Sequence, residues 1–81
     1  MSEYLAQLGR RTELRQAALQ QKIKAKSHLE SLRLALDPLA EIGDLPAEKI
    51  LSLAGLLAEA ITDLQETQAK IKAINDLIGQ G

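Results

Sequence analysis

Residues 50–78 read ILSLAGLLAEAITDLQETQAKIKAINDLI, and this stretch decides the fold. Its apolar residues recur alternately three and four positions apart, and Thr67 is the one non-apolar residue on the line. Such spacing is typical of a helix that packs lengthwise on another helix. We therefore expect a second helix over about 46–78, with a contact line of Ile50, Leu53, Leu57, Ala60, Leu64, Thr67, Ile71, Ile74 and Ile78.

A helix of matching length is predicted upstream, because residues 2–36 contain no proline and a single glycine, Gly9. We expect this helix over about 3–36, with Ser2 as its N-cap and Thr12 as a second cap if Gly9 weakens the first turns. Its predicted contact line comprises Leu14, Ala18, Gln21, Ala25, His28, Leu32, Ala35, Leu39 and Ile42. A second apolar line lies beside the first and comprises Leu5, Leu8, Leu19, Ile23, Leu29, Leu36 and Ala40.

Two proline-containing turn signals separate the helices. Pro38 ends the first helix because proline cannot donate the helical hydrogen bond. Asp37 and Pro38 are interpreted as the cap and first residue of a short helical turn over 38–42, with Gly43 in a left-handed conformation and a connector at 43–45. A connector this short makes the helices antiparallel. The predicted fold class is therefore all-α, an antiparallel two-helix hairpin.

The two halves of the chain carry opposite charge. Residues 1–36 contain seven Lys and Arg and three Glu, a net charge of +4 (7 − 3), whereas residues 37–81 contain three Lys and eight Asp and Glu, a net charge of −5 (3 − 8). An antiparallel hairpin brings these halves together. If the numbers of paired residues sum to about 83, three ion pairs are predicted across the helices: Lys24–Glu59, Lys22–Asp63 and Arg15–Glu66.

Composition limits the class of protein. Residues 1–81 form a single domain near the size at which one core only just stabilises a fold, and the chain has no cysteine for a disulfide. No uncharged stretch is long enough to cross a bilayer. The start, Met1-Ser2-Glu3-Tyr4, is not a basic segment followed by an apolar one, so we expect a cytoplasmic protein with no membrane role.

Few residues suit catalysis or metal binding. His28 is the only histidine, and no acidic residue or second histidine lies three or four positions away, so we interpret it as a residue of the contact line. Glu59, Asp63 and Glu66 share one helix face, but a di-metal bundle site needs Glu-x-x-His motifs, which this sequence lacks. We therefore expect no enzyme activity, small-molecule substrate, cofactor or metal.

A group of cations in the first helix could contact phosphates. The net charge of the chain is only −1, however, and Tyr4 is the only aromatic residue that could stack on a base. Weak nucleic-acid binding through the basic face of this helix therefore stays a third alternative. The residues concerned are Arg10, Arg11, Arg15, Lys22, Lys24 and Lys26.

The turn Gly43-Asp44-Leu45-Pro46-Ala47-Glu48 resembles the hairpin turn of the small subunit of exonuclease VII. That subunit is also a short helical hairpin and acts as a partner-bound accessory chain. The resemblance is confined to the turn, and this sequence departs from the family at Pro38 and in a second helix without aromatic residues. It implies a hairpin turn and carries no function over.

Apolar residues surround most of the second helix between Ile50 and Leu64, which is more than one partner helix can cover. The sequence therefore predicts a non-enzymatic interaction protein that binds itself, as a homodimer or a higher helical bundle, with a four-helix bundle as the simplest form. The alternative is an accessory subunit or inhibitor-like adaptor of a larger protein. The predicted interface comprises Leu29, Leu32, Leu36, Leu39, Ile50, Leu53, Ala54, Leu56, Leu57, Ala60, Ile61, Leu64 and Ile71.

Overall fold

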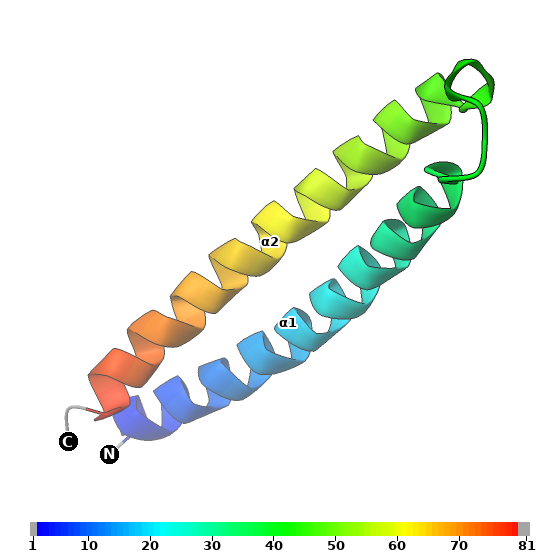
Figure 1. Cartoon of the computed structure of the whole chain (residues 1–81). Helices are drawn as coiled ribbons and strands as arrows, with labels where there is room; N and C mark the ends of the chain where they lie inside the picture. The colour runs from blue at the N-terminus through cyan, green and yellow to red at the C-terminus, as the bar shows by residue number, and fades with distance from the viewer. Residues whose placement is uncertain (1, 80–81) are drawn as a thin grey trace.

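The computed structural model describes residues 2–79 and shows a helical hairpin (Figure 1). Helix α1 spans Ser2–Ala35, a short 3-10 helix η1 spans Ile42–Asp44, and helix α2 spans Ala47–Gly79. The two long helices run antiparallel, and no strand occurs within residues 2–79. The prediction of an all-α hairpin is confirmed. The sequence also predicts that Gly79 and Gly81 end the second helix. Gly79 is the last residue of α2, and Gly81 lies outside the described residues.

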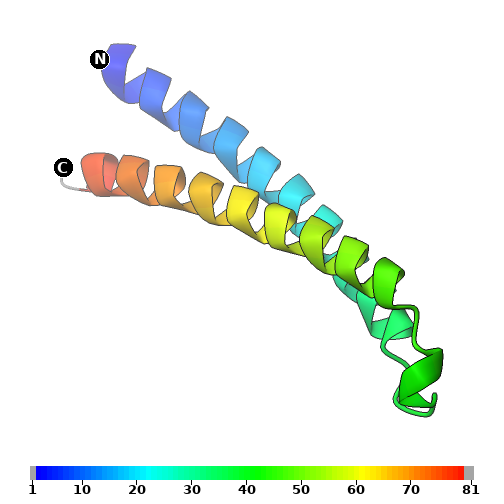
Figure 2. The ribbon, with the colours of Figure 1, turned by 90° about the horizontal axis from the view of Figure 1, so that it is seen from above.

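The hairpin is a rod rather than a globule. Its principal dimensions are 62 × 18 × 16 Å, and its radius of gyration is 18.2 Å, compared with about 12 Å for a globular chain of this length. Seen from above, the helices cross at a shallow angle and bend in the same direction (Figure 2). Only one helix–helix contact is therefore available to bury side chains within the chain.

Within α1 and α2, the predicted contact lines form the seam between the two helices. The buried residues of the described part of the chain all lie on these lines: Ala25, Ala35, Ala60, Thr67 and Ile74. The hydroxyl of Thr67 donates a hydrogen bond to the carbonyl oxygen of Asp63 at 3.1 Å, which satisfies the buried polar group. Thr67 can therefore replace an apolar residue on the line without leaving an unpaired donor in the seam.

The first turns of α1 are continuous helix. Gly9 costs about 1 kcal/mol relative to alanine, which is too little to break a helix that is long on both sides. The hydroxyl of Thr12 donates to the carbonyl oxygen of Leu8 at 3.1 Å, a hydrogen bond of the helix interior. The prediction of Thr12 as a cap is therefore wrong, and Ser2 is the first residue of the helix rather than its N-cap.

The connector differs from its prediction. A carboxylate oxygen of Asp37 accepts the backbone N–H of Leu39 at 2.9 Å, so Asp37 closes a local turn instead of capping a helix over 38–42. The short helix forms later, at Ile42–Asp44, and Gly43 has no positive φ. Because α1 ends at Ala35, Leu39 and Ile42 leave its contact line and are 93% and 86% exposed. Their predicted place in the seam is wrong.

The register of the two helices also differs from its prediction. Nη1 of Arg11 donates to Oδ1 of Asn75 at 2.9 Å, and these residue numbers sum to 86 rather than about 83. A shift of this size displaces the predicted partners along and around their helices. None of the three predicted ion pairs forms. Within residues 2–79 the only salt bridge lies inside α1, between Glu30 and Arg33 at 3.6 Å.

Candidate interaction surface

The hairpin leaves much of its apolar surface in contact with solvent. No large side chain among the described residues is fully buried, and twelve large apolar side chains are exposed. Several of the most exposed lie near the connector, including Leu34, Leu39, Ile42 and Leu51. These exposed side chains make the apolar surface the first candidate for an interaction site. Neither α1 nor α2 contains an apolar stretch that could span a membrane.

The structure divides the thirteen predicted interface residues among three places. Seven occupy the seam and are covered by the other helix to a large extent: Leu32, Ile50, Leu53, Leu57, Ala60, Leu64 and Ile71. Leu29, Leu36, Ala54 and Ile61 border the seam on one side, and Leu56 borders it on the other. Leu39 belongs to the connector. A partner can therefore reach only about half of the predicted set.

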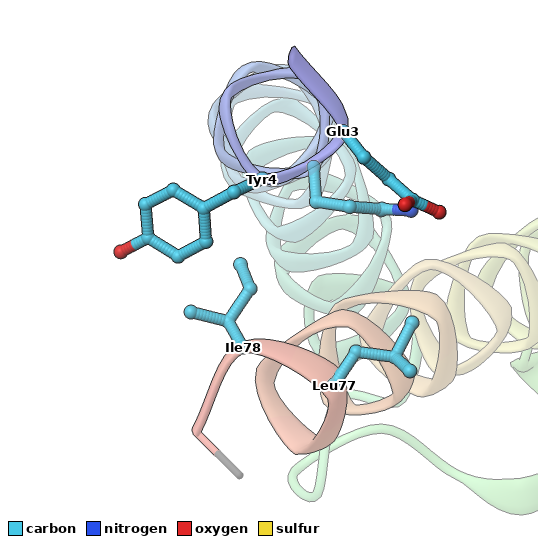
Figure 3. A pocket seen from close by; sticks show the side chains of 5 residues that line it. Glu3, Tyr4, Leu77 and Ile78 are labelled. Atoms are coloured by element: carbon cyan, nitrogen blue, oxygen red, sulfur yellow. The ribbon is translucent and has the colours of Figure 1, made fainter. Parts of the chain in front are cut away.

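Two flanks run along the hairpin, one on each side of the seam. On one side, a shallow groove is lined by Arg15, Leu19 and Lys22 of α1 together with Gln68 of α2. On the other side, a pocket at the open end is lined by Glu3, Tyr4, Gln7, Leu77 and Ile78 (Figure 3). Because both helices follow a seven-residue repeat and run antiparallel, the residue directly after each contact-line residue lies on the first side of the hairpin. The residue directly before each contact-line residue lies on the second side. These positions extend each side along the whole rod.

The first side, which we call the cationic flank, contains no carboxylate. All five of its charged side chains are exposed cations: Arg15, Lys22, Lys26 and Arg33 of α1 and Lys72 of α2. Leucine and isoleucine residues lie among them, with Leu8, Leu19 and Leu29 on α1 and Leu51 and Ile61 on α2. Glu30 lies next to this flank, on the outer face of α1, and pairs with Arg33 at its edge.

The second side, which we call the carboxylate flank, carries charge of both signs. On α2, three successive positions along this flank are acidic and exposed: Glu59, Asp63 and Glu66. Its remaining charged residues are Glu3, Arg10, Glu13 and Lys24 of α1 and Lys49 and Lys70 of α2, which gives a net charge of −1 (4 − 5). Leu34 of α1 and Leu56 and Leu77 of α2 are exposed large apolar residues of this flank.

This difference in charge between the two flanks was not identified from the sequence, because the charges of the two halves of the chain were compared instead. The information was present, because the flanking positions follow from the contact lines by counting one residue forward or back. Sorting the charged residues in this way places every carboxylate of α1 and α2 off the cationic flank. The hairpin therefore has two chemically different sides.

The seam also contains polar residues. Oε1 of Gln21 and Nε2 of His28 are buried and have no hydrogen-bond partner within residues 2–79. Three or more metal-binding side chains come together nowhere in the described part of the chain, so Glu59, Asp63 and Glu66 form no such group. His28 lies in the seam, as predicted.

Comparison with protein-family models, with curated proteins and with solved structures finds no match for this chain. The exposed surface of the hairpin is thus the basis for assigning a function.

Proposed function

We propose that the chain is a non-enzymatic assembly protein whose hairpins associate with one another into a helical bundle. The proposal follows from the shape of the molecule, because two helices bury one stripe each and leave any further apolar surface uncovered. Leu19, Ile61 and Leu56 are examples of large apolar residues that remain exposed on the helices. Further helices packed on the flanks would remove these side chains from water.

The main support for this proposal is the accessible surface area of the chain. The chain exposes 6316 Å², whereas a compact monomer of 8.8 kDa exposes about 4,800 Å². The excess is about 1,500 Å² per chain. A stable protein interface of standard size covers about 800 Å² on each partner. The hairpin therefore has enough additional surface for about two such interfaces.

The test is the mass in solution, measured by sedimentation equilibrium over a range of micromolar concentrations. We expect a species whose mass is a multiple of 8.8 kDa. Dissociation on dilution should be accompanied by loss of helical circular dichroism, because a lone hairpin has little core. A well-folded species of 8.8 kDa at every concentration would refute the proposal.

A further inference from the structure

We infer that copies of the hairpin pack side by side, with the cationic flank of one copy on the carboxylate flank of the next. This inference rests on the proposed self-association and specifies its geometry. The contact is heterologous, so the two copies contribute different surfaces. Each copy then has one surface of each kind available for a neighbour.

The first argument is the charge of the cationic flank. A two-fold contact would place this flank against its own copy, which brings ten exposed cations together (2 × 5) with no carboxylate from either flank. Like charges that face each other across an interface are unfavourable and select against that partner. The cationic flank is therefore suited to a surface other than itself.

The second argument is that the chain carries the complementary surface. Glu59, Asp63 and Glu66 lie three and four positions apart on α2 and extend over about 10 Å of the helix. Lys22 and Lys26 lie four positions apart on α1, about 6 Å along its axis. None of these five side chains has a salt-bridge partner within residues 2–79, so all remain available to a neighbouring copy.

The third argument is the amount and kind of surface. The excess of about 1,500 Å² matches one standard interface on each flank, whereas a two-fold dimer through one flank would leave the other exposed. Leu19 on the cationic flank and Leu56 on the carboxylate flank give both sides an apolar component. Large apolar residues between cations favour an amphipathic helix as the ligand over phosphates, which need only charge.

Two charge-reversal variants test the geometry. In Lys22→Glu/Lys26→Glu the cationic flank loses its central charges, and in Glu59→Lys/Glu66→Lys the carboxylate flank does so. All four residues are exposed and make no side-chain hydrogen bond or salt bridge within residues 2–79, so each variant should match the helicity of the parent chain when both are compared at the same degree of association. Each variant alone should associate at least about tenfold more weakly than the parent chain. An equimolar mixture should recover the parent mass, because each reversed flank then meets a complementary one.

Two further variants change the same number of charges at other positions. Glu41→Lys/Asp44→Lys alters exposed acidic residues of the connector, outside both flanks, and should assemble like the parent chain. Lys24→Glu/Lys70→Glu removes cations from the carboxylate flank and should associate at least as tightly as the parent chain, because the surface that faces the cationic flank becomes more negative. If the connector variant loses assembly and Glu59→Lys/Glu66→Lys does not, the acidic partner of the cationic flank is the connector and the inference is wrong.

The remaining outcomes separate the geometry from the proposed function. If the parent chain assembles but only one of the two flank variants is impaired, the contact is two-fold and the inference fails while self-association stands. Failure of the mixture to recover the parent mass overturns it in the same way. If the parent chain binds a fluorescent duplex DNA and Lys22→Glu/Lys26→Glu loses this binding but still assembles, the cationic flank serves phosphates instead. A parent chain that is monomeric throughout removes both proposals.

Discussion

Truncation of Ile74 to alanine tests whether the seam holds the hairpin together. Ile74 is 5% exposed and is the only large apolar residue among the buried ones of the described chain. Ile74→Ala removes three carbon atoms, each worth about 0.8 kcal/mol when buried, so about 2.4 kcal/mol is lost. The higher helix propensity of alanine stabilises the variant by about 0.4 kcal/mol. We therefore expect the free energy of unfolding to fall by about 2 kcal/mol.

Ile23→Ala is the matched control, because the same atoms are removed from the outer face of α1. Ile23 is 56% exposed, so the removed carbons contribute about 1 kcal/mol before the same gain in helix propensity. The expected net loss is about 0.6 kcal/mol. The two variants should thus differ about threefold in their effect on stability.

The measurement is urea unfolding followed by circular dichroism, with all chains at one concentration because association adds to apparent stability. A larger loss for Ile23→Ala than for Ile74→Ala would show that the outer face of α1, and not the seam, supports the folded state. The placement of the contact lines would then be refuted.

Four further substitutions probe individual features. Gln21→Leu and His28→Leu each remove a buried polar atom without a partner and should each raise the free energy of unfolding by about 1 kcal/mol, whereas a decrease in urea unfolding would reveal a hidden hydrogen bond. Asn75→Ala removes the acceptor of the Arg11 hydrogen bond, which contributes about 1 kcal/mol, while alanine adds about 0.6 kcal/mol in helix propensity. The melting temperature should fall by the equivalent of about 0.4 kcal/mol, and a rise would mean that this bond does not stabilise the hairpin. Gly55→Ala adds a Cβ that meets no atom within 4 Å, so it should stabilise α2 by about 1 kcal/mol without changing the mass in solution. A loss of assembly in this variant would place a neighbouring helix against Gly55.

The contact lines could be predicted from the sequence because a seven-residue repeat specifies which side of a helix is covered. The buried Ala25, Ala60 and Ile74 all lie where this repeat places them. The repeat is a property of each helix by itself and needs no knowledge of the partner. The hairpin could be predicted for the same reason, since it requires only two such helices and a short connection.

The connector and the register could not be predicted because they depend on alternatives of similar energy. Pro38 has a fixed φ that suits the first turn of a helix and also a tight turn, so the sequence pattern alone does not decide between them. The structure adopts the turn closed by Asp37. Since the connector sets the register, this difference also removed the three predicted ion pairs, such as Lys24–Glu59.

The exposed surface was predicted in amount but not in arrangement. The sequence indicated more apolar circumference than one partner could cover, and Leu51, Leu56 and Ile61 are indeed exposed. Which of these share a side follows from the contact lines and the antiparallel pairing, but the sequence was compared by halves of the chain and not by flanking position. The separation of Lys22 from Glu59 onto opposite flanks follows from the same geometry.

The antiparallel arrangement has a consequence for the order in which the helices pair. Ala35 and Ile50, the seam residues nearest the connector, are fifteen positions apart (50 − 35), whereas Arg11 and Asn75 near the open end are 64 positions apart. Closing the longer loop costs about 1.2 kcal/mol more entropy. Pairing of the helices should therefore begin beside the connector and proceed residue by residue toward the open end. Amide hydrogen exchange should be slowest beside the connector and fastest at the open end.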